Sequence, residues 1–256
     1  MFKPATLIIL ALVALAGAAF GVRQYAPEYL PDRFTTDAVL HERMRERIAE
    51  DAEASAFFEK FEVLFPADYT QMMSQLVVMQ RRGDSQRQVL VFGQAYMRSF
   101  MSDNMRHIAT ADADALRAMG ASLAEGIQYL RRENPGACAL YIRAGAAPPS
   151  ELSRLSPEAR AAFIRITNAA LEGIASGKRN PMQYAQPTEA QWLAWLNRYM
   201  ALGGNTTILE ALDNDAQLRA LDPSTICEAS DLMWQAVLQA EDDFIPRFVS
   251  YSMQMQ

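Results

Sequence analysis

Lysine is almost absent from this sequence. Of the 24 basic residues only Lys3, Lys60 and Lys178 are lysine, and the others are arginine. This bias, beside abundant alanine, is typical of GC-rich codon usage, so we expect a GC-rich bacterium as the source. Positive charge is also outnumbered, because 30 acidic residues against 24 basic ones give a net charge of −6. The balance argues against nucleic acid or an anionic lipid surface as the main partner and favours a neutral, cationic or protein partner.

Residues and motifs that carry catalysis are also scarce. The two histidines, His41 and His107, lie too far apart in sequence to form a local zinc-binding pair. The sequence has neither a Gly-x-Ser-x-Gly nor a Ser-x-x-Lys motif for a serine nucleophile. With only 12 glycines and 12 prolines, collagen-like and low-complexity chains are excluded as well. We therefore predict no catalytic residue, no metal site and no cofactor, which favours a protein that is not an enzyme.

The longest apolar run stands at the N-terminus. From Ala5 to Val22 the sequence is uncharged, and these eighteen residues are followed by Arg23. At 1.5 Å per residue the run can just cross a hydrocarbon core of ~30 Å. We expect residues 1–23 to be a signal-anchor in the bacterial inner membrane, with a cleaved signal peptide as the alternative. In both cases the basic residue Lys3 stays cytoplasmic and the chain beyond residue 23 enters the periplasm.

The remainder of the sequence has the periodicity of helices. Residues 24–35 contain two prolines without a period, which predicts an extended spacer. Beyond it, apolar residues recur at steps of three and four, as in Leu116, Met119, Leu123, Ile127 and Leu130. Strand-like alternation and hairpin turns are lacking. The sequence therefore predicts an all-α fold, a single domain over 36–256 with about seven to nine helices and a possible internal break at 144–150.

Capping residues and stop signals place the individual helices. We expect helices near 36–63, 67–82, 86–107, 112–133, 156–177, 188–202 and 225–241, a short one after Cys138 and a bent one around Pro246. Gly177 is expected to end the helix that starts after Ser156. The helix at 86–107 is apolar almost all round, which predicts a central position.

Two cysteines remain in a chain that we expect to be exported. Cys138 and Cys227 form an even number in a compartment where thiols are oxidised, so the sequence predicts a disulfide between them. The alternative is a pair of separate buried thiols, because free cysteine is often buried. A metal role is disfavoured, since two thiolates without nearby histidines do not complete a tetrahedral site.

Two further groups of residues are candidates for chemistry. Glu125, Glu133 and Glu228 stand near apolar faces, and a peptidoglycan hydrolase needs only one or two such carboxylates as general acid. Solvated glutamates at the edge of an apolar stripe are the alternative.

Methionine is abundant, with 14 residues, and three of them lie four apart on one predicted helix: Met97, Met101 and Met105. Thioethers bind copper(I), although methionine also fills gaps in helical cores. The favoured interpretation is a membrane-tethered, non-catalytic binding protein of the bacterial envelope, whose ligand is an envelope protein or a small molecule. A peptidoglycan hydrolase and, more weakly, a methionine-based copper carrier are the alternatives.

Overall fold

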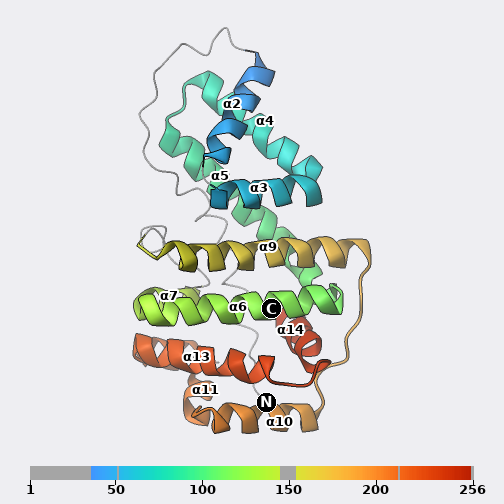
Figure 1. Cartoon of the computed structure of the whole chain (residues 1–256), viewed down its shortest axis with the longest axis vertical. Coiled ribbons are helices and arrows are strands. Elements are labelled where there is room, and N and C mark those ends of the chain that lie inside the picture. Colours follow the sequence, from blue (N-terminus) through green and yellow to red (C-terminus); the bar gives the residue numbers. More distant parts are fainter. Residues whose placement is uncertain (1–35, 51, 145–153, 213, 255–256) are drawn as a thin grey trace.

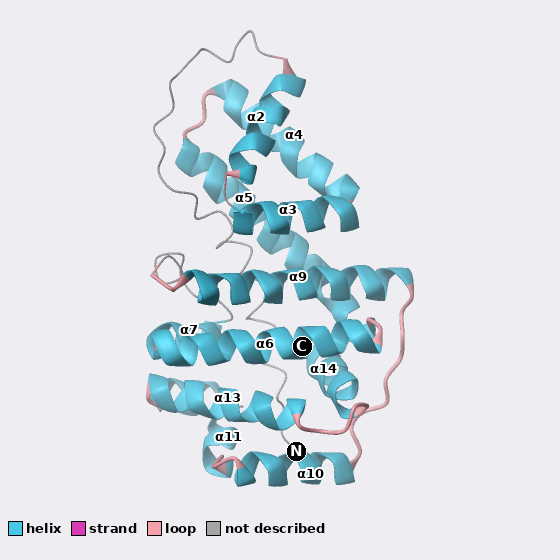
Figure 2. Cartoon of the chain, viewed as in Figure 1, coloured by secondary structure: helices cyan, strands magenta, loops and turns pink. Residues whose placement is uncertain are grey.

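The computed structural model describes residues 36–50, 52–144, 154–212 and 214–254. Within these residues the chain forms twelve α-helices and one short 3-10 helix, without a strand (Figure 2). The predicted all-α fold is confirmed. The number of helices is larger than the seven to nine expected from the sequence, because one expected helix is divided and short helices add to the others.

The first four helices of the described part pack together at one end of the molecule (Figure 1). They are α2 (Asp37–Ala49), α3 (Ala52–Leu64), α4 (Pro66–Arg82) and α5 (Gln86–Asn104). The prediction of a single helix over 36–63 is therefore wrong. The chain changes direction between α2 and α3, so both helices pack against α4. Neither glycine nor proline marks this change, so the sequence pattern continues through it.

Four further helices lie side by side in the order α9, α6, α13 and α10 (Figure 1). Their bounds are Pro157–Arg179, Ala113–Glu133, Pro223–Leu238 and Glu189–Ala201. Hydrogen bonds at both ends hold α6 antiparallel to α9. Ser156 Oγ at the start of α9 donates to Glu133 at the end of α6 (2.6 Å), and Ser176 Oγ near the end of α9 donates to Asp112 before α6 (2.6 Å).

Shorter helices complete the body. The 3-10 helix η2 (Met105–Thr110) follows α5, and α7 (Pro135–Ala144) follows α6 and packs against α13. The chain returns from α10 to α13 through α11 (Thr206–Leu212) and α12 (Asp215–Ala220), and α14 (Phe244–Gln254) ends the described part. The sequence pattern did not predict η2, α11 and α12 because six or seven residues are too few to establish a helical period.

The helix starts expected at Asp112, Ser156 and Thr188 are confirmed. The short helix expected after Cys138 instead begins at Pro135 and contains that cysteine, and one expected end is also wrong. Asp112, Ser156 and Thr188 each accept a hydrogen bond from a backbone N–H in the first turn of α6, α9 and α10. By contrast, α9 continues past Gly177 to Arg179. Gly177 is required by a close approach of η2, because a Cβ at this position would overlap the carbonyl group of His107.

The predicted leader is not covered by the structure. Ala5–Val22, the spacer 24–35 and residues 145–150 of the expected break lie outside the described residues. Across the part that is described, none of the helices combines the length and the apolar character that crossing a membrane requires.

Candidate binding site

The turn between α4 and α5 is defined by its own sequence. Gly83 ends α4 in the left-handed conformation (φ 79°), and its N–H and that of Asp84 donate to carbonyls of the last turn of α4. Ser85 then starts α5 with a capping box, in which Gln88 Oε1 accepts from the Ser85 N–H (2.8 Å). Because both helix ends are capped within three residues, the two helices form a tight antiparallel hairpin.

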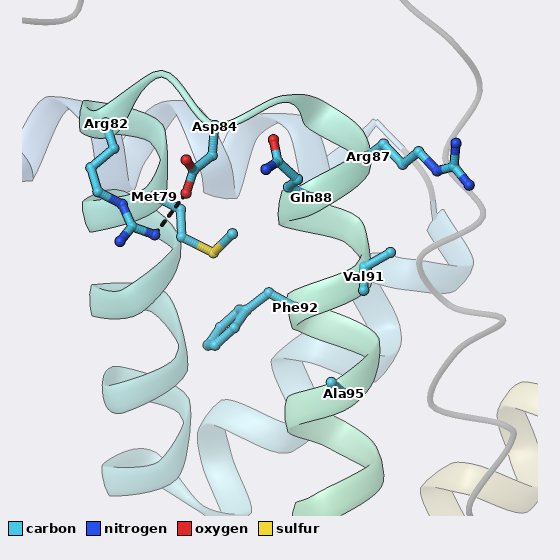
Figure 3. A pocket seen from close by; sticks show the side chains of 8 residues that line it. All are labelled: Met79, Arg82, Asp84, Arg87, Gln88, Val91, Phe92 and Ala95. Carbon is cyan, nitrogen blue, oxygen red and sulfur yellow. Dashed lines mark hydrogen bonds and ion pairs between the residues drawn. The ribbon is translucent and has the colours of Figure 1, made fainter.

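An open groove of about 870 Å³ lies along this hairpin (Figure 3). Phe92 points from α5 across the gap towards α4, where Met79 faces it. At the turn, Arg82 and Asp84 form an ion pair (2.8 Å). The groove is lined by Met79, Arg82, Asp84, Arg87, Gln88, Val91, Phe92 and Ala95. It therefore has an apolar floor and a polar rim, which is the usual composition of a binding cleft.

Contacts beneath the groove hold its floor in place. The Phe92 ring packs against Tyr96 one turn further along α5, with ring centroids 6.1 Å apart. The Tyr96 hydroxyl donates to the Asp68 carbonyl in α4 (2.9 Å). Burial, and secondarily the Asp68 carboxylate, raise the pKa of Tyr96, so its hydroxyl keeps the proton that it donates. This bond ties α4 to α5 below the opening.

The lining includes one strongly exposed apolar side chain. Val91 on α5 is 55% exposed. A solvent-facing helix surface normally carries polar side chains. The exposed Val91 thus adds apolar surface to the groove that a partner could cover.

The polar side chains of the lining are the Arg82–Asp84 ion pair, Arg87 and Gln88. As far as the described residues show, the lining contains no histidine, cysteine or hydroxyl side chain, and its one carboxylate, on Asp84, is already paired with Arg82. A nucleophile with an adjacent base, or two carboxylates facing each other, would be needed for hydrolysis.

The two cysteines named by the sequence come together elsewhere. Cys138 in α7 and Cys227 in α13 lie at disulfide-bonding distance, with Cα atoms 5.7 Å apart, and both side chains are fully buried. The cysteine pair connects two helices of the core and lies outside the lining of the groove.

The three candidate glutamates are separated and each makes structural contacts. Glu125 pairs with Arg165 across α6 and α9 (2.6 Å), and Glu133 accepts from the Ser156 hydroxyl and N–H. These bonds lower the pKa of Glu133 below its ordinary value. Glu228 pairs with Arg131 (2.9 Å). None of the three lines the groove.

The three methionines lie in the protein core. Met97 and Met101 are fully buried and Met105 is 6% exposed, in contact with the main apolar cluster. His41 belongs to α2 and His107 to η2, on different parts of the body. In the described ranges no three side chains of the types His, Cys, Asp or Glu are grouped as metal ligands would be.

Sequence reasoning missed the groove because it treated residues 86–107 as one central helix. Only the second half of α5 is central, where Met97, Phe100 and Met101 are buried. The first half lies at the edge, with Val91 exposed. The available signal was the tight turn Gly83–Ser85 ahead of a helix that is apolar almost all round, since such a helix near a chain reversal can present one apolar face outward.

Fold and site together define an all-helical protein with an open, apolar-floored groove in a helical hairpin. No family model matches the sequence, and neither the curated proteins nor the solved structures include a match to it.

Proposed function

We propose that this chain is a non-catalytic binding protein of the bacterial envelope, tethered to the inner membrane by residues 5–22, and that it binds its partner in the α4–α5 groove. The observation that carries the proposal is the open groove itself, whose apolar floor and exposed Val91 have no cover in the described residues. Removing such surface from water stabilises a complex by about 25 cal/mol per Å² before the costs of association.

Two features support the location. The uncharged stretch Ala5–Val22 has the length of a membrane span, and Lys3 on its N-terminal side favours export of the residues after the span. The pair Cys138–Cys227 at disulfide distance suits an oxidising compartment such as the periplasm. A soluble periplasmic protein released by signal peptidase is the alternative.

Location is tested by fusions and fractionation. Alkaline phosphatase fused after residue 34 should be active, and a reporter that works only in the cytoplasm should be inactive at the same junction. The full chain should sediment with membranes and resist extraction by high salt. Activity of the cytoplasmic reporter fused after residue 34 would refute export. Recovery of the mature protein in the soluble periplasmic fraction would refute only the membrane anchor.

Binding is tested by photocrosslinking in the native cells. A photoreactive amino acid at position 91, in the lining, should give a defined adduct in membranes, while the same residue at position 63 should not. Val63 is 79% exposed on α3 and is not part of the lining, so it is a matched surface control. Equal adducts from both positions, or none from position 91, would contradict binding in the groove.

A further inference from the structure

We infer that the occupant of the groove is an amphipathic helix of a second membrane protein, taken from a segment close to the inner membrane and carrying an acidic side chain that pairs with Arg87. This inference rests on the proposed function and identifies the partner of the same site. Three independent features lead to it: the shape of the groove, the charges on its rim, and its position relative to the start of α2.

The shape favours a third helix. The floor residues Met79 and Phe92 are half-buried and face each other between two antiparallel helices (Figure 3). A helix can lay its side chains into such a furrow, and packed helices approach to interaxial distances of 8–10 Å. A bilayer surface is nearly flat and would contact the rims without reaching the floor. Helices that bind in grooves use apolar residues at spacings of three and four.

The charges on the rim favour an acidic flank. Arg82 already has Asp84 as a partner, whereas Arg87 is exposed and has no carboxylate partner within the described residues. Arg87 and Val91 are four residues apart and share a face of α5, so a helix that covers Val91 also shields Arg87 from water. An unpaired, desolvated guanidinium is costly, and a carboxylate on the incoming helix removes that cost.

Net charge does not oppose this pairing. The chain carries −6 overall, but charges beyond a Debye length of ~8 Å at physiological salt are largely screened. The electrostatic energy of an incoming carboxylate therefore depends on Arg87 at the rim of the groove more than on the distant carboxylates of the chain.

The position of the groove brings it near the membrane. Asp37, the first residue of α2, pairs with Arg81 (2.7 Å), and Arg81 precedes Arg82 of the groove. The point where residues 24–35 join the domain is thus at the same end as the groove. Twelve residues can span at most ~40 Å when extended. If residues 5–22 lie in the bilayer, the groove meets segments of other membrane proteins that lie just outside it.

A pair of designed peptides tests the inference. Both are fluorescent helices of about five turns with the same leucine stripe at spacings of three and four. One has glutamate on the flanks and the other lysine. Fluorescence anisotropy is measured with the full chain in nanodiscs of zwitterionic lipid, with empty nanodiscs as blank. The acidic peptide should bind about tenfold more tightly than the basic one, because only it can pair with Arg87.

Variants of the chain locate the binding. Val91→Asp should weaken binding of the acidic peptide about tenfold or more, while Val63→Asp, on the more exposed surface of α3, should leave that binding unchanged. Arg87→Glu should reverse the preference, so that the basic peptide now binds more tightly. Circular dichroism of each variant confirms that it remains folded.

Three results would overturn the inference. The first is equal binding of the two peptides, and the second is a preference for the acidic peptide that survives Arg87→Glu. The third is that neither peptide binds, whereas the chain binds phosphatidylglycerol vesicles and Val91→Asp abolishes that binding. The last result would assign the groove to lipid. The peptide assay does not depend on where the chain resides in the cell, and the fusion assay does not depend on the groove, so failure of the inference and failure of the proposed location are distinguishable.

Discussion

Gly177 of α9 lies directly against the backbone of His107 in η2. A Cβ at position 177 would overlap the His107 carbonyl group and would come within 2.9 Å of the Thr110 hydroxyl oxygen. The absence of a side chain therefore allows the 3-10 helix to pack onto the last turns of α9, next to the Asp112–Ser176 hydrogen bond that joins α9 to α6.

Gly177→Ala should destabilise the protein by about 2–3 kcal/mol, because a buried backbone contact has to open. Gly173→Ala is the matched control one turn earlier in α9, where the added methyl group would meet Ile108 at an ordinary 3.5 Å. It should be neutral or stabilising by up to ~1 kcal/mol, since alanine is the better helix former. Urea unfolding followed by circular dichroism measures both. Equal effects would show that the contact between η2 and α9 is not a tight one.

Arg131→Ala should cost about 2–3 kcal/mol of stability. Arg131 donates to the Asp231 carboxylate (2.6 Å), whose side chain is only 4% exposed, and its loss leaves that carboxylate buried without its cation. Arg132→Ala is the control: the neighbouring guanidinium lies over the Tyr129 ring (4.8 Å) at the surface, and its removal should cost less than about 1 kcal/mol. A double variant, Arg131→Ala with Asp231→Ala, should recover part of the loss. If the two single arginine variants unfold at the same urea concentration, the buried pair has no special role.

Ser176→Ala should lower stability at neutral pH by about 0.5–1 kcal/mol, a small amount because Asp112 is solvent-exposed and screened. The hydrogen bond from Ser176, followed by the backbone N–H of Ala115, lowers the pKa of Asp112 below its ordinary value. A carboxyl group with a lowered folded pKa contributes stability above its unfolded pKa of about 4, and this contribution is lost as pH falls through the folded pKa. The difference between wild type and variant should therefore shrink below about pH 4.

The measurement is urea unfolding of both proteins at pH 7 and pH 3, with Ser102→Ala on the exposed face of α5 as the control for a serine deletion. A difference of the same size at both pH values would mean that the Asp112 charge is not involved.

The Cys138–Cys227 pair should resist labelling and reduction in the folded protein, because both sulfur atoms are buried. Thiol labelling in denaturant, on protein isolated without reductant, should find no free thiol. A bridge across about ninety residues stabilises by at most ~4–5 kcal/mol in the chain-entropy model. Replacing both cysteines by serine should thus lower Tm by about 10 °C. Two reactive thiols, or an unchanged Tm, would contradict a structural disulfide.

The sequence alone determined the class of fold and much of its helix plan. Apolar residues at helical spacing predicted α6 with its buried stripe Leu116–Leu130, and capping residues placed the starts of α6, α9 and α10. These features are local, since periodicity and caps depend on neighbours within one or two turns. The proximity of Cys138 and Cys227 was also predicted, because it required only their number and an expected compartment.

Only the tertiary structure decided which apolar faces are covered. The first half of α5 looked as central as the second, yet Val91 is exposed and Met97 is buried, because α5 extends from the core to the edge of the body. Likewise, Gly177 resembled a helix stop, but it serves a contact with η2, seventy residues earlier in the chain. Burial depends on which distant segment packs against a residue. A sequence pattern that repeats every three or four residues is local and does not determine which segment that is.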